Sequence, residues 1–318
     1  MSREILPEIV PEKPLLAIFH RISKDFKKNW FVYLMVLPVV TYYLIFYYVP
    51  MYGIQIGFKD FNIAKGYSGS PWVGLKYFKM FFDSFYLWRV LRNTVLINLY
   101  ELIFSFPAPI LFALLLNEVK NRRFKKYVQT ISYLPHFIST VVICGIITNF
   151  CVSDGLINDI ISLLGGERNS LLQNVKYFRT IFIASGIWQG LGFSSIIYFA
   201  AISAVDQELY QSAIIDGASR FRQVWHITLP SIKPTIIILL ILNIGGFLNV
   251  GFQKIILLYN PATYEVADVI SSHVYTYGLQ KLNWSYGAAV GLFNSVANLI
   301  LLIAANRVSK KVSEISLW

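Results

Sequence analysis

The stretch TVLINLYELIFSFPAPILFALLL, residues 94–116, decides the fold class of this chain. Its only charged residue is Glu101, and its length suffices for a membrane crossing, because a spanning helix needs about 20 predominantly apolar residues. Such a run would aggregate in water, so its natural solvent is lipid. The stretch therefore predicts a transmembrane helix.

Five other stretches resemble it in length and in their lack of charge. They are residues 31–49, 128–150, 180–205, 235–253 and 286–305. The short alternating strands of a membrane barrel are not apparent between them. Charged residues make up 14% of the 318 residues, against about 25% in soluble domains. We predict an all-α, polytopic membrane protein with six transmembrane helices.

The basic residues indicate how the chain crosses the membrane. Lys and Arg are concentrated in residues 117–127 and occur again in 206–233 and in the C-terminal tail. By the positive-inside rule these segments are cytoplasmic, and with six spans both the N and C termini are cytoplasmic as well. The net charge of +11 is thereby accounted for without a nucleic-acid partner, for which no soluble basic domain is apparent.

Three regions are expected along the chain. Residues 1–30 form a cytoplasmic segment whose apolar residues recur at helical spacing between basic ones, which is typical of an amphipathic helix on the membrane surface, or of an ordinary solvent-facing helix. These apolar residues are Leu15, Phe19, Ile22, Phe26 and Trp30. Residues 31–305 form the transmembrane domain, and residues 306–318 a cytoplasmic tail.

Signals for catalysis or for a cofactor are missing from the sequence. The two cysteines, Cys144 and Cys151, lie in or beside an apolar span, and the four histidines lack metal-ligand spacing. A Gly-x-x-x-x-Gly-Lys-Ser/Thr phosphate loop is also absent. We expect no catalytic residue, no metal and no cofactor in this chain.

Residues 206–230 carry the most specific pattern. They predict two short helices, the first capped by Asp206 and closed at Gly217, the second capped by Ser219 and ending by Pro230. The hairpin is too apolar to lie bare in water, so a partner surface is implied.

This segment resembles the EAA loop of permeases in binding-protein-dependent ABC importers. Gly217 and Leu229-Pro230 match its spacing, whereas Gln211 and Ser212 replace its leading Glu and first Ala. The resemblance implies a type I ABC importer permease fold, in which the loop is a coupling helix that docks in a groove of the ATPase subunit. The residues it assigns to ATPase coupling are Tyr210, Gln211, Ser212, Ala213, Asp216, Gly217, Ala218, Leu229 and Pro230. Gln211 can keep a hydrogen bond to the ATPase but not a salt bridge.

Other motifs resemble those of sugar permeases. They are Val73-Gly74-Leu75-Lys76-Tyr77-Phe78, Asn93-Thr94, and two segments similar to importers of oligosaccharides or polysaccharide fragments, residues 114–119 and 133–139. The resemblance implies a multi-pass subunit of the bacterial inner or plasma membrane that forms the pathway for a carbohydrate. Its implied partners are a second, similar permease subunit, two ATP-binding subunits that carry ATP and Mg, and an extracytoplasmic solute-binding protein.

Two other functions stay open at this point. An ABC permease for a non-sugar solute would share the coupling loop. A membrane-embedded enzyme would need acidic residues, His or Arg clustered at the membrane interface, where this chain shows only scattered charges.

The spans contain polar residues that could contact a sugar. Glu101 could contact its hydroxyls or serve a proton path, or it could lie near the outer end of its span and pair with Arg92 or a partner helix. Amides and indoles offer neutral hydrogen-bonding groups and a flat apolar face, although inter-helical contacts are their commoner role. These further candidates are Trp188, Gln189, Asn243, Asn249, Asn294 and Asn298.

Overall fold

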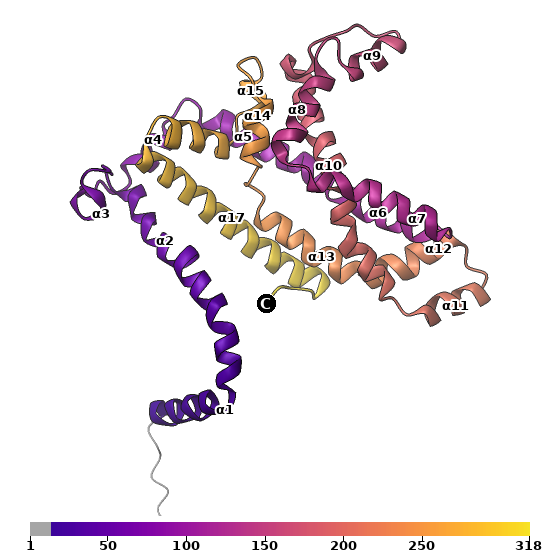
Figure 1. The fold of residues 1–318 in the computed structure, drawn as a ribbon, viewed down its shortest axis with the longest axis horizontal. Helices are drawn as coiled ribbons and strands as arrows, with labels where there is room; N and C mark the ends of the chain where they lie inside the picture. Colours follow the sequence, from indigo (N-terminus) through magenta and orange to yellow (C-terminus); the bar gives the residue numbers. More distant parts are fainter. Residues whose placement is uncertain (1–13) are drawn as a thin grey trace, which may run out of the picture. The chain divides into compact units, whose positions relative to one another are not determined.

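The computed structural model describes the backbone of residues 14–318 and the side chains of residues 24–318. The chain divides into two compact units after Gln55 (Figure 1). Over residues 14–318 the regular structure is helical, and the one β contact is an isolated bridge between Lys59 and Trp72. Within the described residues, six helical stretches are long and apolar enough to cross a membrane, which confirms the predicted number of spans.

The first unit holds one long helical stretch. Its elements are α1 (Pro14–Tyr43), the π-helical turn η1 (Leu44–Tyr48) and α2 (Val49–Met51), followed by the 3₁₀ turn η2 (Tyr52–Phe58) that leads into the second unit. Asn29 leaves helical geometry with φ −119°, and its side-chain amide donates to Asp25 at 2.7 Å. This break lies beside the predicted boundary at residue 30. Residues 1–13 and the side chains of Leu15, Phe19 and Ile22, on which the amphipathic helix depends, lie outside the described part of the chain.

The second unit contains the other five candidate spans. Its helices are α3 (Gly66–Gly69), α4 (Lys76–Phe82), α5 (Leu87–Tyr100), η3 (Glu101–Ser105), α6 (Pro107–Glu118), α7 (Arg122–Tyr133), η4 (Leu134–Phe137), α8 (Thr140–Cys151), α9 (Leu156–Leu163), η5 (Leu171–Gln173), α10 (Val175–Ser203), α11 (Gln207–Ile215), α12 (Arg220–Gln223), η6 (Val224–Thr228), α13 (Leu229–Gly245), α14 (Phe252–Leu258), α15 (Tyr264–Ala267), α16 (Ile270–His273), η7 (Val274–Gln280) and α17 (Trp284–Ser313).

The third predicted span, residues 128–150, is wrong in its limits. Helix α7 ends at Tyr133, and the candidate span is 140–163 instead. Pro135 has no N–H to continue the helix, and Ser139 adopts an extended conformation with φ −61° and ψ 147°. The Ser139 hydroxyl accepts a hydrogen bond from the Val142 N–H and thereby starts α8 as a new helix.

The fifth predicted span is also shifted, and the predicted stop at Pro230 is wrong. Helical structure runs without interruption from Arg220 to Gly245 and ends eight residues short of the predicted limit at 253. The wide π-turn η6 precedes the proline, and the Ser231 hydroxyl donates to the Ile227 carbonyl at 2.7 Å. The helix continues through the proline, because the π-type bond from the Leu229 N–H to the Val224 carbonyl changes the hydrogen-bond register just before the residue that lacks an N–H.

Three apolar clusters hold the second unit together. Helices α6, α10 and α13 meet around Ala113 and Ile202, and α8, α10 and α14 meet around Ile143 and Phe178. Helices α4, α5 and α17 meet around Phe81. The α17 helix continues to Ser313, so the predicted tail 306–318 begins inside a helix.

Candidate functional site

Of the hairpin predicted over residues 206–230, the first helix forms as α11 and the turn follows it, whereas the second arm is the start of the continuous helix from Arg220 to Gly245. The Asp206 carboxylate accepts from the Glu208 N–H at 2.9 Å and starts α11. Gly217 has φ +74°, and the N–H of Ala218 donates to the Ala213 carbonyl at 2.8 Å, which closes the helix with a left-handed cap. Ser219 then caps α12 by accepting from the Arg222 N–H.

The hairpin presents apolar side chains to its surroundings. Among the candidate coupling residues, Gln211 and Ser212 are exposed, while Tyr210 and Ala213 are half-buried. Large apolar residues of the same segment are also exposed, namely Leu209, Ile214, Ile215, Phe221 and Trp225. A surface of this kind is typical of a protein contact.

The other face of α11 is tied to the membrane helices. The Tyr210 hydroxyl lies 2.9 Å from the Thr228 hydroxyl, in η6 just before α13. The side-chain amide of Gln223 donates to the Ala218 carbonyl at 2.9 Å, which attaches the turn between the helices to α12. A displacement of α11 would therefore be passed to α13 through the hairpin itself.

A second connection leads from the hairpin to α6. The Arg220 guanidinium lies 3.3 Å from the Glu118 carboxylate at the end of α6. Beside this pair, the Lys125 ammonium lies 4.4 Å from the centre of the Phe199 ring on α10. Burial lowers the pKa of Lys125 from its ordinary value, and Glu118 partly offsets this effect. The Arg220–Glu118 pair thus links the hairpin to α6 as well as to α13.

A cavity of about 560 Å³ lies between the second, fourth and fifth spans. Its lining includes Glu101 and Ser105 from η3, Ser194 from α10, and Asn243 from α13. Of the seven candidate pathway residues, the structure brings Glu101 and Asn243 to this cavity. Among the described ion pairs none involves Glu101, so the predicted pairing with Arg92 is not formed.

Lys254 lies next to this cavity, and it was not among the residues predicted to line the pathway. Its ammonium donates to the Phe182 carbonyl at 2.9 Å and lies 4.7 Å from the Phe182 ring centre. A Cβ on Gly186, which lines the cavity, would lie 3.3 Å from this ammonium. Lys254 directly follows the predicted span 235–253, and a lone lysine before the apolar Ile255-Ile256-Leu257-Leu258 was an available signal.

The other candidate pathway residues lie elsewhere. Trp188 lines an apolar groove between α8 and α10, and Gln189 does not line the cavity. The side-chain amides of Asn294 and Asn298 both donate to the Asn249 side-chain oxygen, at 2.8 and 3.1 Å. These three asparagines join the segment after α13 to α17.

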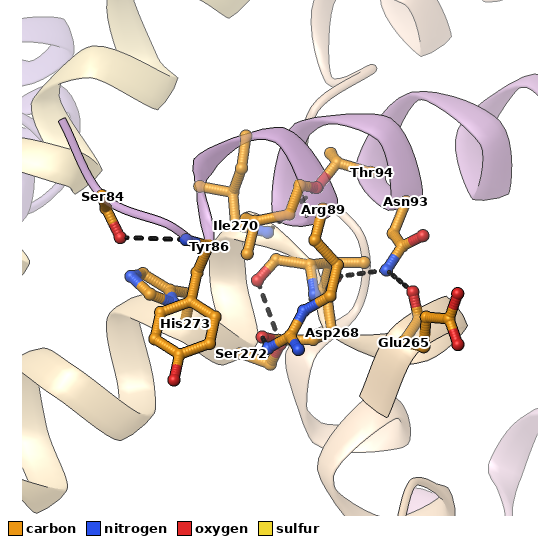
Figure 2. Close-up of polar contacts among 12 residues, drawn as sticks. Ser84, Tyr86, Arg89, Asn93, Thr94, Glu265, Asp268, Ile270, Ser272 and His273 are labelled. Carbon is orange, nitrogen blue, oxygen red and sulfur yellow. Dashed lines mark hydrogen bonds and ion pairs between the residues drawn. The ribbon is translucent and has the colours of Figure 1, made fainter. Parts of the chain in front are cut away.

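A buried polar network fixes the segment that precedes the sixth span (Figure 2). The Asn93 side-chain amide donates to the carbonyls of Glu265 and Asp268, each at 2.9 Å. Thr94 accepts from the Ile270 N–H at 2.9 Å, and Arg89 pairs with Asp268 at 2.9 Å. The Asn-Thr motif thus attaches α5 to residues 265–270, a role that its sequence alone did not predict.

Comparisons with known proteins agree with this architecture. Residues 105–314 match the family described as binding-protein-dependent transport system inner membrane component. The chain is 44% identical to Protein LplB of Bacillus subtilis (strain 168), over 98% of this chain and 100% of that one. It is 47% identical to the polygalacturonan/rhamnogalacturonan transport system permease protein YteP of the same organism, over 89% of each chain.

A solved structure also matches. A bacterial alginate ABC transporter in complex with alginate pentasaccharide-bound periplasmic protein contains a chain that is 42% identical, with a TM-score of 0.86. The match covers 93% of this chain and 100% of that one. With six apolar helices among its described residues and a match over residues 105–314, this chain belongs to the inner membrane component family of binding-protein-dependent transport systems, as a bacterial multi-pass membrane permease.

Proposed function

We propose that this chain forms the translocation pathway of an ATP-driven importer for a carbohydrate, an oligosaccharide or polysaccharide fragment. The observation that carries the proposal is the α11 hairpin, whose exposed apolar face is tied to α13 by the Tyr210–Thr228 contact. Two similar chains support the substrate class, since one transports polygalacturonan or rhamnogalacturonan and another belongs to an alginate transporter.

We propose the partners that the family resemblance implies. Two separate subunits bind and hydrolyse ATP with Mg, and one of them receives the exposed face of α11. A second permease subunit, similar but not identical, encloses the pathway, and an extracytoplasmic binding protein delivers the solute. Both termini and residues 206–230 are then cytoplasmic, and this chain performs no chemistry of its own.

The mechanism is a shift between two states. Nucleotide binding favours one arrangement of the ATPase subunits, and the hairpins pass this preference to the spans because they are rigidly attached to them. Solute held in the cavity by hydroxyl and amide groups such as Ser105, Ser194 and Asn243 would be exposed to the two sides of the membrane in turn.

The test is reconstitution. The chain is co-expressed with its neighbouring transport genes, purified by a tag on this chain alone, and placed in proteoliposomes with the binding protein. We expect an ATPase subunit to co-purify, and ATP-dependent uptake of at least one of three probes, namely oligosaccharides from alginate, from polygalacturonan or from arabinan. ATP-dependent uptake of amino acids or peptides alone would favour a non-sugar permease, and turnover without an ATPase subunit would favour an enzyme.

A further inference from the structure

A second pocket, of about 270 Å³, lies apart from the central cavity. Its walls are the beginning of α5 and the segment from residue 259 to residue 277, which precedes the sixth span. Ligand pockets for drug-sized molecules are typically about 300–1,000 Å³. This pocket is therefore suited to one small ring rather than to a longer chain.

Tyrosines dominate the pocket wall. Tyr86, Tyr259, Tyr264 and Tyr277 all line it, and the Thr276 hydroxyl lies among them. A tyrosine offers a flat apolar face and a hydroxyl that both donates and accepts. A sugar ring has the complementary surface, with C–H groups on its faces and hydroxyls around its edge.

The charges on the wall neutralise each other. The Arg89 guanidinium pairs with the Asp268 carboxylate at 2.9 Å, and the Ser272 hydroxyl donates to the same carboxylate at 2.7 Å (Figure 2). The His273 ring is fully buried, lies 4.3 Å from the Tyr277 ring centre and is bonded through Nε2 to the Tyr286 hydroxyl. With its opposite charges already paired, this wall favours a ligand recognised through hydroxyls.

Two nitrogens of the wall residues have unmet hydrogen-bonding capacity. Arg89 Nε and His273 Nδ1 are both buried and have no hydrogen-bond partner within the described residues. Each such atom costs about 1–3 kcal/mol. Because both atoms are buried, a ligand reaches them only if the wall residues move, whereas the tyrosine and Thr276 side chains line the pocket itself.

The position of the pocket along the fifth span indicates on which side of the membrane it opens. The uninterrupted helix from Arg220 to Gly245 separates it from the coupling hairpin, and 26 residues span about 39 Å. Under the proposed topology the pocket therefore opens on the extracytoplasmic side, where a binding protein releases its solute.

We propose that this tyrosine-rich pocket is a carbohydrate subsite that holds one sugar ring of the incoming chain before it enters the central cavity. The proposal rests on the proposed function, because it assumes that the chain transports carbohydrate. The subsite raises the local concentration of the solute at the entrance, so its loss should appear in the KM for uptake rather than in the maximal rate.

The first experiment removes two hydroxyls and keeps both side-chain shapes. The double variant Tyr264→Phe/Thr276→Val is compared with Tyr275→Phe, a change on the same η7 turn at a residue that does not line the pocket. In proteoliposomes with the complete transporter, we expect the double variant to raise the KM for the imported alginate, polygalacturonan or arabinan oligosaccharide about ten-fold. The maximal rate and the ATPase activity without binding protein should stay within about two-fold of wild type. Tyr275→Phe should behave as wild type.

The second experiment measures occupancy directly. The native cysteines Cys144 and Cys151 are both buried, so Thr276→Cys places a reactive thiol in the pocket wall against a low background. The transported oligosaccharide should slow labelling of this thiol by a membrane-impermeant maleimide at least five-fold.

The outcomes separate the two proposals. A wild-type complex that imports no carbohydrate overturns the proposed function and the subsite together. A wild-type complex that imports carbohydrate, with an unchanged KM in Tyr264→Phe/Thr276→Val or with no protection of Thr276→Cys, overturns the subsite alone.

Discussion

The hydroxyl of Tyr210 on α11 lies 2.9 Å from the hydroxyl of Thr228, one residue before α13 begins. This contact joins the proposed ATPase-docking helix to the base of the fifth span. It complements the covalent path through α12 and η6, so two routes lead from α11 into α13.

Replacing Tyr210 with Phe should weaken coupling while leaving the ring in place. A hydrogen bond contributes about 0.5–1.5 kcal/mol, so we expect the number of solute molecules imported per ATP to fall about two- to ten-fold. Uptake and ATP hydrolysis are measured on the same proteoliposomes. Tyr127→Phe on the exposed face of α7 is the matched control, and an unchanged ratio in Tyr210→Phe would show that the contact transmits nothing.

Gly217 can be tested by backbone preference alone. A Cβ at this position meets no atom within 4 Å, but φ is +74°, which β-branched residues strongly disfavour and asparagine tolerates. Gly217→Val should therefore uncouple ATP hydrolysis from uptake, whereas Gly217→Asn should retain most of the uptake. Equal activity in the two variants would mean that the left-handed turn is not required.

The ion pair between Glu118 and Arg220 can be tested by exchange. Exposed pairs contribute about 0.2–1 kcal/mol, so Glu118→Arg and Arg220→Glu should each lower uptake by up to about five-fold. The double exchange should recover most of the loss if the pair itself matters. The loss of uptake in the two single variants should be smaller at 1 M salt, because the Debye length is then about 3 Å and the charges are screened. A double exchange no better than the worse single variant contradicts this role.

Asn93 should contribute strongly to stability because it is fully buried and bonds across to another segment. In Asn93→Ala the carbonyls of Glu265 and Asp268 lose their donor, which costs about 2–3 kcal/mol and should lower the Tm of the detergent-purified complex. Asn98→Ala is the matched control, because the buried Asn98 on the same helix donates to the Thr94 carbonyl one turn away, a contact within α5 itself. Equal Tm shifts would argue against the cross-link.

His273 should make stability depend on pH. Burial lowers the pKa of His273 from its usual value of 6.5. The unfolded chain therefore binds a proton at a pH where the folded chain does not, so stability is retained above pH 6.5 and decreases as the pH falls toward the lowered pKa. In thermal unfolding of the purified complex between pH 7.5 and 5.5, His273→Gln should flatten this decrease, while His226→Gln on η6 should leave it unchanged. An unaltered slope in His273→Gln would assign the effect to other groups.

The sequence by itself determined that the chain lies in lipid, the number of spans among the described residues, and the first helix and turn of the hairpin. Six apolar runs of sufficient length require lipid whatever their neighbours are, and Asp206, Gly217 and Ser219 act through hydrogen bonds and backbone preferences within a few residues. Interactions between residues this close in the sequence can be predicted from the sequence itself.

Only the tertiary structure decided the limits of the third and fifth spans and the grouping of the polar residues. Pro135 follows the end of a helix, whereas Pro230 lies inside a continuous helix just after a π-turn, and the two prolines are not distinguished by their own residue type. Lys254 reaches Phe182 over 72 positions of sequence separation, and Asn93 reaches Asp268 over 175. Contacts at such separation depend on how the helices pack, and no pattern along a single chain specifies that packing.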